Sequence, residues 1–186
     1  MDAARITAAA IETLDEVGLD ALSMRRIARR LGVEVGGLYY HLPNKAALLA
    51  AMADELCREA LGGHRGDDPV ALCLAIRATL RSHRDAARVL AASPLAGSLG
   101  ALELMERLIT MLEPLVGDAR ANPAADTLLA YLTGYVLQEE AAMAAGRIAA
   151  PPDELRSRFP RIFGGIEEPD ASFETAVRAI IAGYRC

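Results

Sequence analysis

Positively charged side chains gather in one short stretch of the sequence. Residues 21–46 hold four arginines and one lysine against a single acidic residue, Glu34, so the stretch carries +4. The whole chain carries −5, and the remaining residues therefore sum to −9. The basic residues are Arg25, Arg26, Arg29, Arg30 and Lys45. A basic end on an acidic body is typical of a protein that touches nucleic-acid phosphates with one end only, although a solvated helix face would carry the same charges.

Two neighbouring tyrosines follow the arginines. Tyr39 and Tyr40 are two of only five tyrosines in a chain with three Phe and no Trp. Neighbours on a helix point about 100° apart, so at least one ring stays exposed if Leu38 and Leu42 face inward. Exposed rings beside arginines favour contact with phosphates or bases. The alternative is a ring that packs against an adjacent helix and carries no function.

The elements that position these residues read as a helix-turn-helix. We expect helices over about 4–17, 24–31 and 34–41, with Ser23 as the N-cap of the second helix and Gly32 at the turn. In this motif the second helix of the pair enters the major groove, where its early residues meet base edges. The residues left on its outer side are Val35, Gly36, Gly37, Tyr39, Tyr40 and His41.

Adjacent glycines interrupt this short helix. Gly36 and Gly37 each reduce helix stability by roughly 1 kcal/mol relative to Ala. Without side chains the backbone can approach DNA closely, and few groups remain to read bases; the alternative is a frayed helix that tightens on binding. Beyond it, Asn44 is a good N-cap for the next helix, and Lys45 stands where helix amides also bind phosphate.

The rest of the sequence also favours helices. No alternating strand pattern and no Asn-Gly hairpin signal occurs. Further helices are expected over about 45–61, 69–82, 84–92, 98–116, 122–145 and 172–184, with Pro114 fraying one end and a loop with at most one helical turn over 151–169. Nine or ten helices predict an all-α fold. We divide it into a DNA-binding domain, 1–46, and an effector-binding and dimerisation domain, 47–186.

Composition and cysteine spacing exclude other classes of protein. A hydrophobic content of 53% excludes a disordered chain. Cys57, Cys73 and Cys186 have no CxxC spacing and are odd in number, so we expect reduced thiols. No signal peptide is recognised, and the longest uncharged run, 89–102, is too short and too broken to span a bilayer. We therefore expect a cytoplasmic protein without a membrane partner.

Residues 6–49 resemble the DNA-binding domain of the tetracycline-repressor (TetR) family of bacterial transcription regulators. The segments that carry the resemblance are Ile6–Ile11, Glu16–Leu19, Leu22–Arg25, Ile27–Ala28, Leu31–Val33, Leu38–Leu42 and Asn44–Lys45. Residues 84–89, 133–139 and 173–184 are similar to segments of the tetracycline-repressor branch itself.

The resemblance implies specific DNA contacts. Arg25 would read a base or a phosphate, the aromatic pair and His41 would meet the DNA backbone, and Lys45 would bind phosphate. The predicted DNA-binding residues are Ser23, Arg25, Val35, Gly36, Gly37, Tyr39, Tyr40, His41 and Lys45. Tetracycline repressors carry polar or proline residues where this chain has Val35 to Gly37, which implies a different operator.

The sequence says less about the residues that would bind the effector than about those that would bind DNA. The resemblance places Leu90 where tetracycline repressors use a metal-coordinating His, so magnesium-tetracycline is not the expected ligand. We expect no metal site and no cofactor in the chain, and whether a metal accompanies the effector stays open. The sequence also lacks the spacings of di-iron and zinc sites. The candidates to line an apolar pocket are His64, His83, Met105, Tyr131, Gln138 and Glu139. For each the alternative is a structural role, such as Met105 as core filler or His64 as a surface loop residue.

Wide apolar arcs on the last two long helices indicate a second copy of the chain. An arc wider than one seam can serve the protomer core and a partner together, although burial in one large core would look the same. A two-fold dimer would place two reading helices about 34–36 Å apart, one turn of DNA. The predicted interface residues are Tyr135, Ala142, Val177, Ile180, Ile181 and Tyr184.

These features together predict a homodimeric, ligand-responsive repressor that a small apolar molecule releases from its operator, and no enzyme. Two alternatives stay open. A helical-bundle carrier or enzyme whose basic end does not read DNA would show no salt-dependent DNA binding. A DNA-binding protein without effector control would have no core cavity of roughly 300 Å³ or more.

Overall fold

The computed structural model of the chain describes residues 2–93, 97–144, 152–163 and 169–185. Within these ranges all regular elements are helices, which confirms the predicted all-α class. They are α1 (Ala3–Val17), α2 (Met24–Leu31), α3 (Val35–His41), α4 (Lys45–Gly63), α5 (Pro69–Ser82), α6 (Ala86–Ala91), α7 (Leu99–Val116), α8 (Asp118–Ala144), α9 (Asp153–Arg158), α10 (Pro160–Phe163) and α11 (Pro169–Tyr184). None of these helices is long and apolar enough to cross a membrane.

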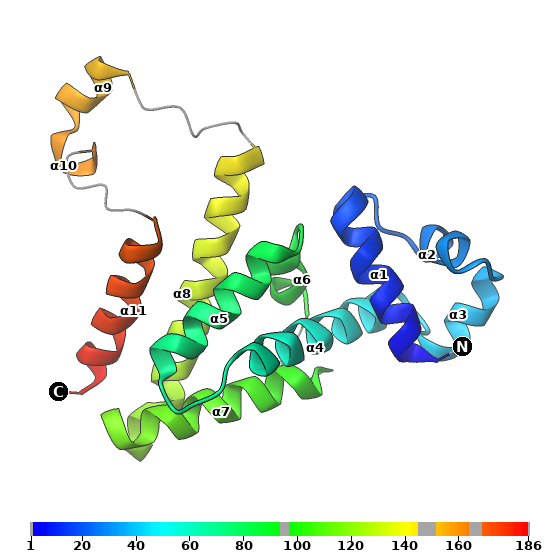
Figure 1. Ribbon diagram of the computed structural model, residues 1–186, viewed down its shortest axis with the longest axis horizontal. Helices are drawn as coiled ribbons and strands as arrows, with labels where there is room; N and C mark the ends of the chain where they lie inside the picture. The colour runs from blue at the N-terminus through cyan, green and yellow to red at the C-terminus, as the bar shows by residue number, and fades with distance from the viewer. Residues whose placement is uncertain (1, 94–96, 145–151, 164–168, 186) are drawn as a thin grey trace.

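Helices α1 to α3 form a small head at one end of the molecule (Figure 1). Its core consists of fully buried side chains from each helix, among them Ile6, Ile27 and Leu38. Helix α2 begins at the predicted cap, where the Ser23 hydroxyl accepts a hydrogen bond from the Arg26 amide. It ends at Gly32, whose φ of +68° is the left-handed conformation that glycine adopts without strain. The α2–α3 turn therefore follows from the sequence as predicted.

Helix α4 leads out of the head into a larger body (Figure 1). There it packs against α5, α6 and α7, while α8 packs against α5, α6, α7 and α11. Helix α7 begins directly on α4 because residue 100 is glycine: a Cβ there would collide with the Asp54 backbone. The Asp54 carboxylate also accepts hydrogen bonds from the Gly100 amide and the Ser98 hydroxyl.

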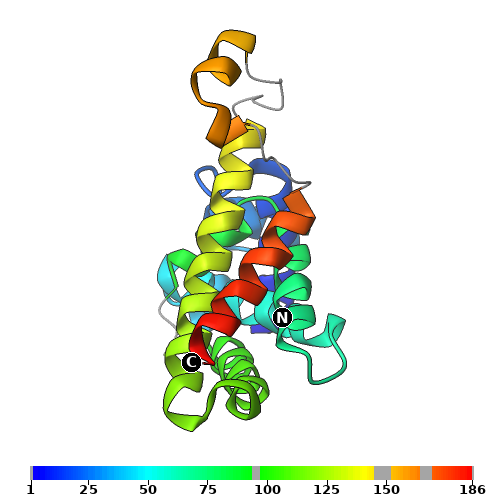
Figure 2. The same ribbon diagram turned by 90° about the vertical axis from the view of Figure 1, so that its left-hand side faces the viewer.

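Helices α8 and α11 run side by side along one face of the body (Figure 2). They are held together near one end by Arg77 of α5, which is 4% exposed. Its guanidinium donates to Glu139 of α8 at 2.6 and 3.1 Å and to Asp170 of α11 at 2.8 Å. The same group lies 4.8 Å above the Phe173 ring. A buried charge that is paired this fully fixes the relative position of three helices.

Several predicted helix boundaries were wrong. Helix α8 begins at Asp118 rather than at Asn122, because Gly117 at φ +85° turns the chain straight from α7 into α8 and Pro123 is accommodated near the start. Helix α7, by contrast, ends at Val116 as predicted, with Pro114 in its last turn. Residues 153–163 form two short helices rather than a loop with one turn. The predicted end of the long helix, at residues 145 and 146, lies outside the described residues, as does Cys186.

Candidate nucleic-acid interface and cavity

Both paired tyrosines are exposed on the head. The Tyr40 side chain is 87% exposed and that of Tyr39 is 46% exposed. The His41 ring meets Tyr40 edge-on, with the ring centroids 5.2 Å apart. Leu38 instead is fully buried and anchors α3 to the head. The reading in which a tyrosine packs inside the head is therefore wrong for both rings.

The four clustered arginines divide into two roles. Arg30 turns back to α1 and donates to Glu12 at 2.9 Å and to Glu16 at 2.7 and 2.8 Å. These hydrogen bonds raise the pKa of Arg30 and lower that of Glu16. The others, Arg25, Arg26 and Arg29, are exposed and form no ion pair within the described ranges. Arg30 therefore braces α2 against α1, and three arginines stay available to phosphates.

The remaining predicted DNA-binding residues lie on the same two helices or next to them. Ser23 caps α2, and Val35 begins α3 half-buried against the head. Gly36 is exposed and has no atom within 4 Å of the place a Cβ would take, so its backbone is open to an approaching surface. The other three are Gly37, exposed on α3; His41, half-exposed at its end; and Lys45, exposed at the start of α4.

The loop between α5 and α6 connects the head to the body. The His83 imidazole lies between two carboxylates, with Nδ1 2.9 Å from Asp15 of α1 and Nε2 3.1 Å from Glu59 of α4. The carboxylate of Asp85 accepts a hydrogen bond from the Leu19 amide at 2.8 Å. Asp85 has φ +58°, a conformation that a non-glycine residue adopts only where its surroundings hold it. This loop therefore fixes how the head sits on the body.

The protonation of His83 depends on these contacts. Burial alone lowers the pKa of the imidazole, but the hydrogen bonds and the charges of Asp15 and Glu59 outweigh burial and raise it. Both ring nitrogens face a carboxylate oxygen, so only the doubly protonated ring donates on both sides.

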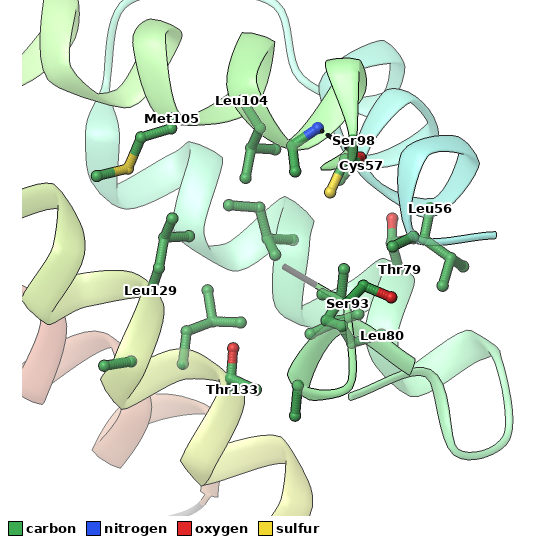
Figure 3. A pocket seen from close by; sticks show the side chains of 18 of the residues that line it. Leu56, Cys57, Thr79, Leu80, Ser93, Ser98, Leu104, Met105, Leu129 and Thr133 are labelled. Carbon is green, nitrogen blue, oxygen red and sulfur yellow. Dashed lines mark hydrogen bonds between the residues drawn. The ribbon is translucent and has the colours of Figure 1, made fainter. Parts of the chain in front are cut away.

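A cavity of about 490 Å³ lies in the body between α4, α5, α6, α7 and α8. Figure 3 shows leucines around it, among them Leu56 and Leu104, with the hydroxyl groups of Thr79, Ser93 and Thr133 between them. Cys57 also lines it; burial, with a contribution from Asp54, raises the pKa of this thiol to about 12, so the thiol stays protonated. In the parts of the chain that the structure describes, no group of His, Cys, Asp and Glu is arranged to hold a metal ion.

Comparison with known proteins decides the family. The family model for bacterial regulatory proteins, tetR family, matches residues 6–52. The model for the tetracyclin repressor-like C-terminal domain matches residues 66–186. The chain belongs to the TetR family. It is accordingly a DNA-binding, ligand-responsive transcriptional regulator and not an enzyme.

Relatives of this regulator align along almost its whole length. The tetracycline repressor protein class G of Vibrio anguillarum is 33% identical over 198 residues, which cover 99% of this chain and 93% of that protein. A possible TetR family transcriptional regulator from Streptomyces coelicolor A3(2) superposes with a TM-score of 0.81 at 29% identity, covering 99% and 98% of the two chains. BioQ in complex with its double-stranded DNA operator superposes with a TM-score of 0.73 at 29% identity, covering 100% and 99%.

The structure places the six predicted effector residues of this TetR-family chain in several environments. Only Met105 lines the cavity. His83 is at the junction with the head, Glu139 is paired with Arg77, and Tyr131 stacks on Phe173 with the ring centroids 5.7 Å apart. The other two are His64, half-buried at the end of α4, and Gln138, exposed on α8.

The sequence analysis missed the polar residues that do line the cavity. They are Thr79, Ser93, Ser98, Asp126 and Thr133. Short hydroxyl side chains scattered over four segments have no spacing that distinguishes them from ordinary helix residues. Leu90 could be placed only through the resemblance to tetracycline repressors, and it does line the cavity.

The predicted interface residues divide by burial. Val177 and Ile181 are at most 3% exposed and belong to the core of this protomer. The Tyr184 hydroxyl lies 2.8 Å from that of Thr127 on α8. Tyr135, Ile180 and Tyr184 are half-buried, and Ala142 is exposed. A partner could therefore contact these four residues. The interface stays a prediction. The division of the chain at residue 46 also stays a prediction.

Proposed function

We propose that this regulator represses transcription as a homodimer whose α2–α3 faces bind an operator, and that a small apolar molecule in the cavity releases it. One observation carries the proposal: the cavity is walled by α4 and α6, the elements that also hold the head. Ala53, Leu56 and Cys57 of α4 face the same space as Leu90 and Ala91 of α6. The site of action is the cytoplasm.

The DNA-binding half of the proposal follows from the exposed groups of the head. The side chains of Tyr40, Arg25 and Lys45 are exposed and form no hydrogen bond or ion pair within the described residues. Basic side chains and helix N-termini both bind phosphates. The similarity to BioQ bound to its operator supports the same use of the head. A dimer with two-fold symmetry would read two half-sites about one helical turn apart.

Release requires that the effector prefer one position of α4. Helix α4 reaches from Lys45 beside the reading helix to the cavity wall, and the loop at His83 holds the same helix through Glu59. A molecule that binds more tightly to one arrangement of α4 and α6 increases the population of that arrangement, and with it one spacing of the two heads. The size of this shift is set by the difference in affinity between the two arrangements. Coupling of about 1–3 kcal/mol changes operator affinity about 5- to 150-fold.

The size of the cavity supports this proposal over a DNA-binding protein without effector control. At about 490 Å³ it is within the range of ligand pockets. Its lining is chiefly aliphatic, which favours an apolar molecule over a sugar or a nucleotide.

Filling the cavity tests the proposal. Ala130 and Ala141 are both exposed alanines of α8, but only Ala130 lines the cavity. A panel of neutral aromatic compounds is screened for release of labelled operator, measured by fluorescence anisotropy. We expect the Ala130→Trp variant to bind operator and to lose the response, and Ala141→Trp to respond like the unchanged protein. An Ala130→Trp protein that still releases DNA at the same concentrations would refute an effector site here.

A further inference from the structure

The described lining of the cavity carries a single charge, and that charge is negative. Among the described residues that line it, Asp126 of α8 is the one charged side chain; the others are apolar, or carry a neutral hydroxyl or thiol. The hydroxyls of Thr79 and Thr133 can hydrogen-bond a neutral polar group of a ligand. Neither they nor any other lining side chain can neutralise an anion.

Asp126 stands where the cavity opens. Its residue is exposed, and it lines both the cavity and a groove on the surface between α7 and α8. Met105 of α7 is the other residue common to the two. The described chain gives Asp126 no ion pair, so its charge faces whatever passes from the groove into the cavity.

The groove beyond this opening is acidic as well. Glu103 and Glu106 of α7 line it together with Asp126. The single basic residue there, Arg107, is already engaged: its guanidinium donates to the carbonyl of Gly66 at 2.7 Å and to Asp67 at 2.9 Å. Three carboxylates therefore act on the opening with little compensation, and their field attracts cations and repels anions.

We propose that the effector is an amphiphilic organic cation, whose apolar body fills the cavity and whose positive group is held by Asp126 at the opening. This inference rests on the proposed function, because it concerns the molecule that occupies the same cavity. A single carboxylate at a solvated opening changes affinity modestly, and we expect about fivefold between matched cationic and neutral ligands.

A matched ligand series tests this charge selectivity. 4-Phenylbutylamine, 4-phenylbutanol and 5-phenylpentanoate share one phenylbutyl group and are cationic, neutral and anionic at pH 7. Their dissociation constants are measured by calorimetry on the full-length protein and on Asp126→Asn and Glu113→Gln. Glu113 is an exposed carboxylate of α7 that lines neither space, so its variant controls for net charge.

We expect the amine to bind tightest and the acid weakest, and we expect the difference between amine and alcohol to vanish in Asp126→Asn but not in Glu113→Gln. Equal binding of all three ligands, or an unchanged order in Asp126→Asn, would overturn the charge selectivity while leaving an effector cavity in place. Binding of none of them, or binding that Ala130→Trp does not weaken, would instead remove the cavity as the effector site.

Discussion

The Nδ1 atom of His83 lies 2.9 Å from a carboxylate oxygen of Asp15, and this contact joins the body to the head. On its other side the same ring meets Glu59 of α4 at 3.1 Å. The charged groups around it also include Arg84, whose amide donates to Asp15, and Glu16, whose carbonyl accepts from the Arg84 guanidinium. One titrating ring therefore bridges α1 and α4, the two helices whose relative position sets the head.

This bridge makes stability depend on pH. The pKa of His83 is raised in the folded protein, so its stabilising contribution is complete below the ordinary value of 6.5 and is lost as pH rises through the higher folded value. We expect the free energy of unfolding to fall between about pH 6 and pH 8 by more in the unchanged protein than in His83→Gln. Urea unfolding at several pH values measures the difference; parallel pH profiles of the two proteins would contradict the bridge.

Glu140 of α8 lies at the same junction, and we expect its substitution to stabilise the protein at high pH. Burial and the charge of Asp85 raise the pKa of Glu140 to about 6, against the weaker effects of Ala87 and Arg88. A charged Glu140 is thus unfavourable above pH 6. We expect Glu140→Gln to stabilise the protein by about 1 kcal/mol at pH 8, a value reduced for partial exposure, and by nothing near pH 4.

Thermal unfolding at the two pH values measures this effect. Glu106→Gln, at an exposed position of α7, is the control, and we expect it to change stability by less than about 0.5 kcal/mol at either pH. An equal gain in both variants, or a gain in Glu140→Gln that persists at pH 4, would rule out burial of the charge as the cause.

We expect substitutions of Tyr40 and Arg30 to have different effects, the first on operator binding and the second on thermal stability. The Tyr40 ring is exposed and lies outside the core, so Tyr40→Ala is expected to weaken operator binding at least tenfold with a melting temperature nearly unchanged. Arg30 holds α2 to α1 through Glu12 and Glu16, so Arg30→Ala is expected to lower the melting temperature. Differential scanning fluorimetry and anisotropy separate the two effects. A loss of fold in Tyr40→Ala would mean that the ring is structural.

The apolar face of α11 predicts the dimer contact. Ile180 is half-buried beside Val177 and Ile181, which lie in the protomer core. A charge at this position disfavours contact with a second copy, so we expect Ile180→Asp to give a folded monomer. Light scattering gives the mass, and circular dichroism checks the helical content. A folded Ile180→Asp protein that stays dimeric would place the interface elsewhere.

The head could be predicted from sequence in detail because its signals are local. Gly32, Ser23 and Asn44 act within one turn of the chain, and each does in the structure what its residue type favours. The start of α8 was predicted wrongly, because Pro123 was read as the beginning of the helix. In the structure the helix begins earlier, at Asp118, and contains this proline.

The cavity and the junction could not be predicted in the same way. Thr79 and Thr133 are separated by more than 50 positions in the printed sequence and share a cavity only after α5 and α8 pack. His83 has the residue type of a ligand-binding side chain, but Asp15 and Glu59, brought to it by the fold, make it a bridge instead. Such roles arise from tertiary contacts, and residue type alone does not separate them.

Selection from a pool of randomised DNA duplexes tests the central claim most directly. The purified full-length protein is used to enrich the pool, and binding to the enriched sequence is then followed by anisotropy as salt is raised. The account predicts an inverted repeat with half-sites about one helical turn apart, bound with an affinity that falls steeply with salt and is lost in Arg25→Ala. Recovery of no common sequence, or binding that Arg25→Ala leaves intact, would contradict it.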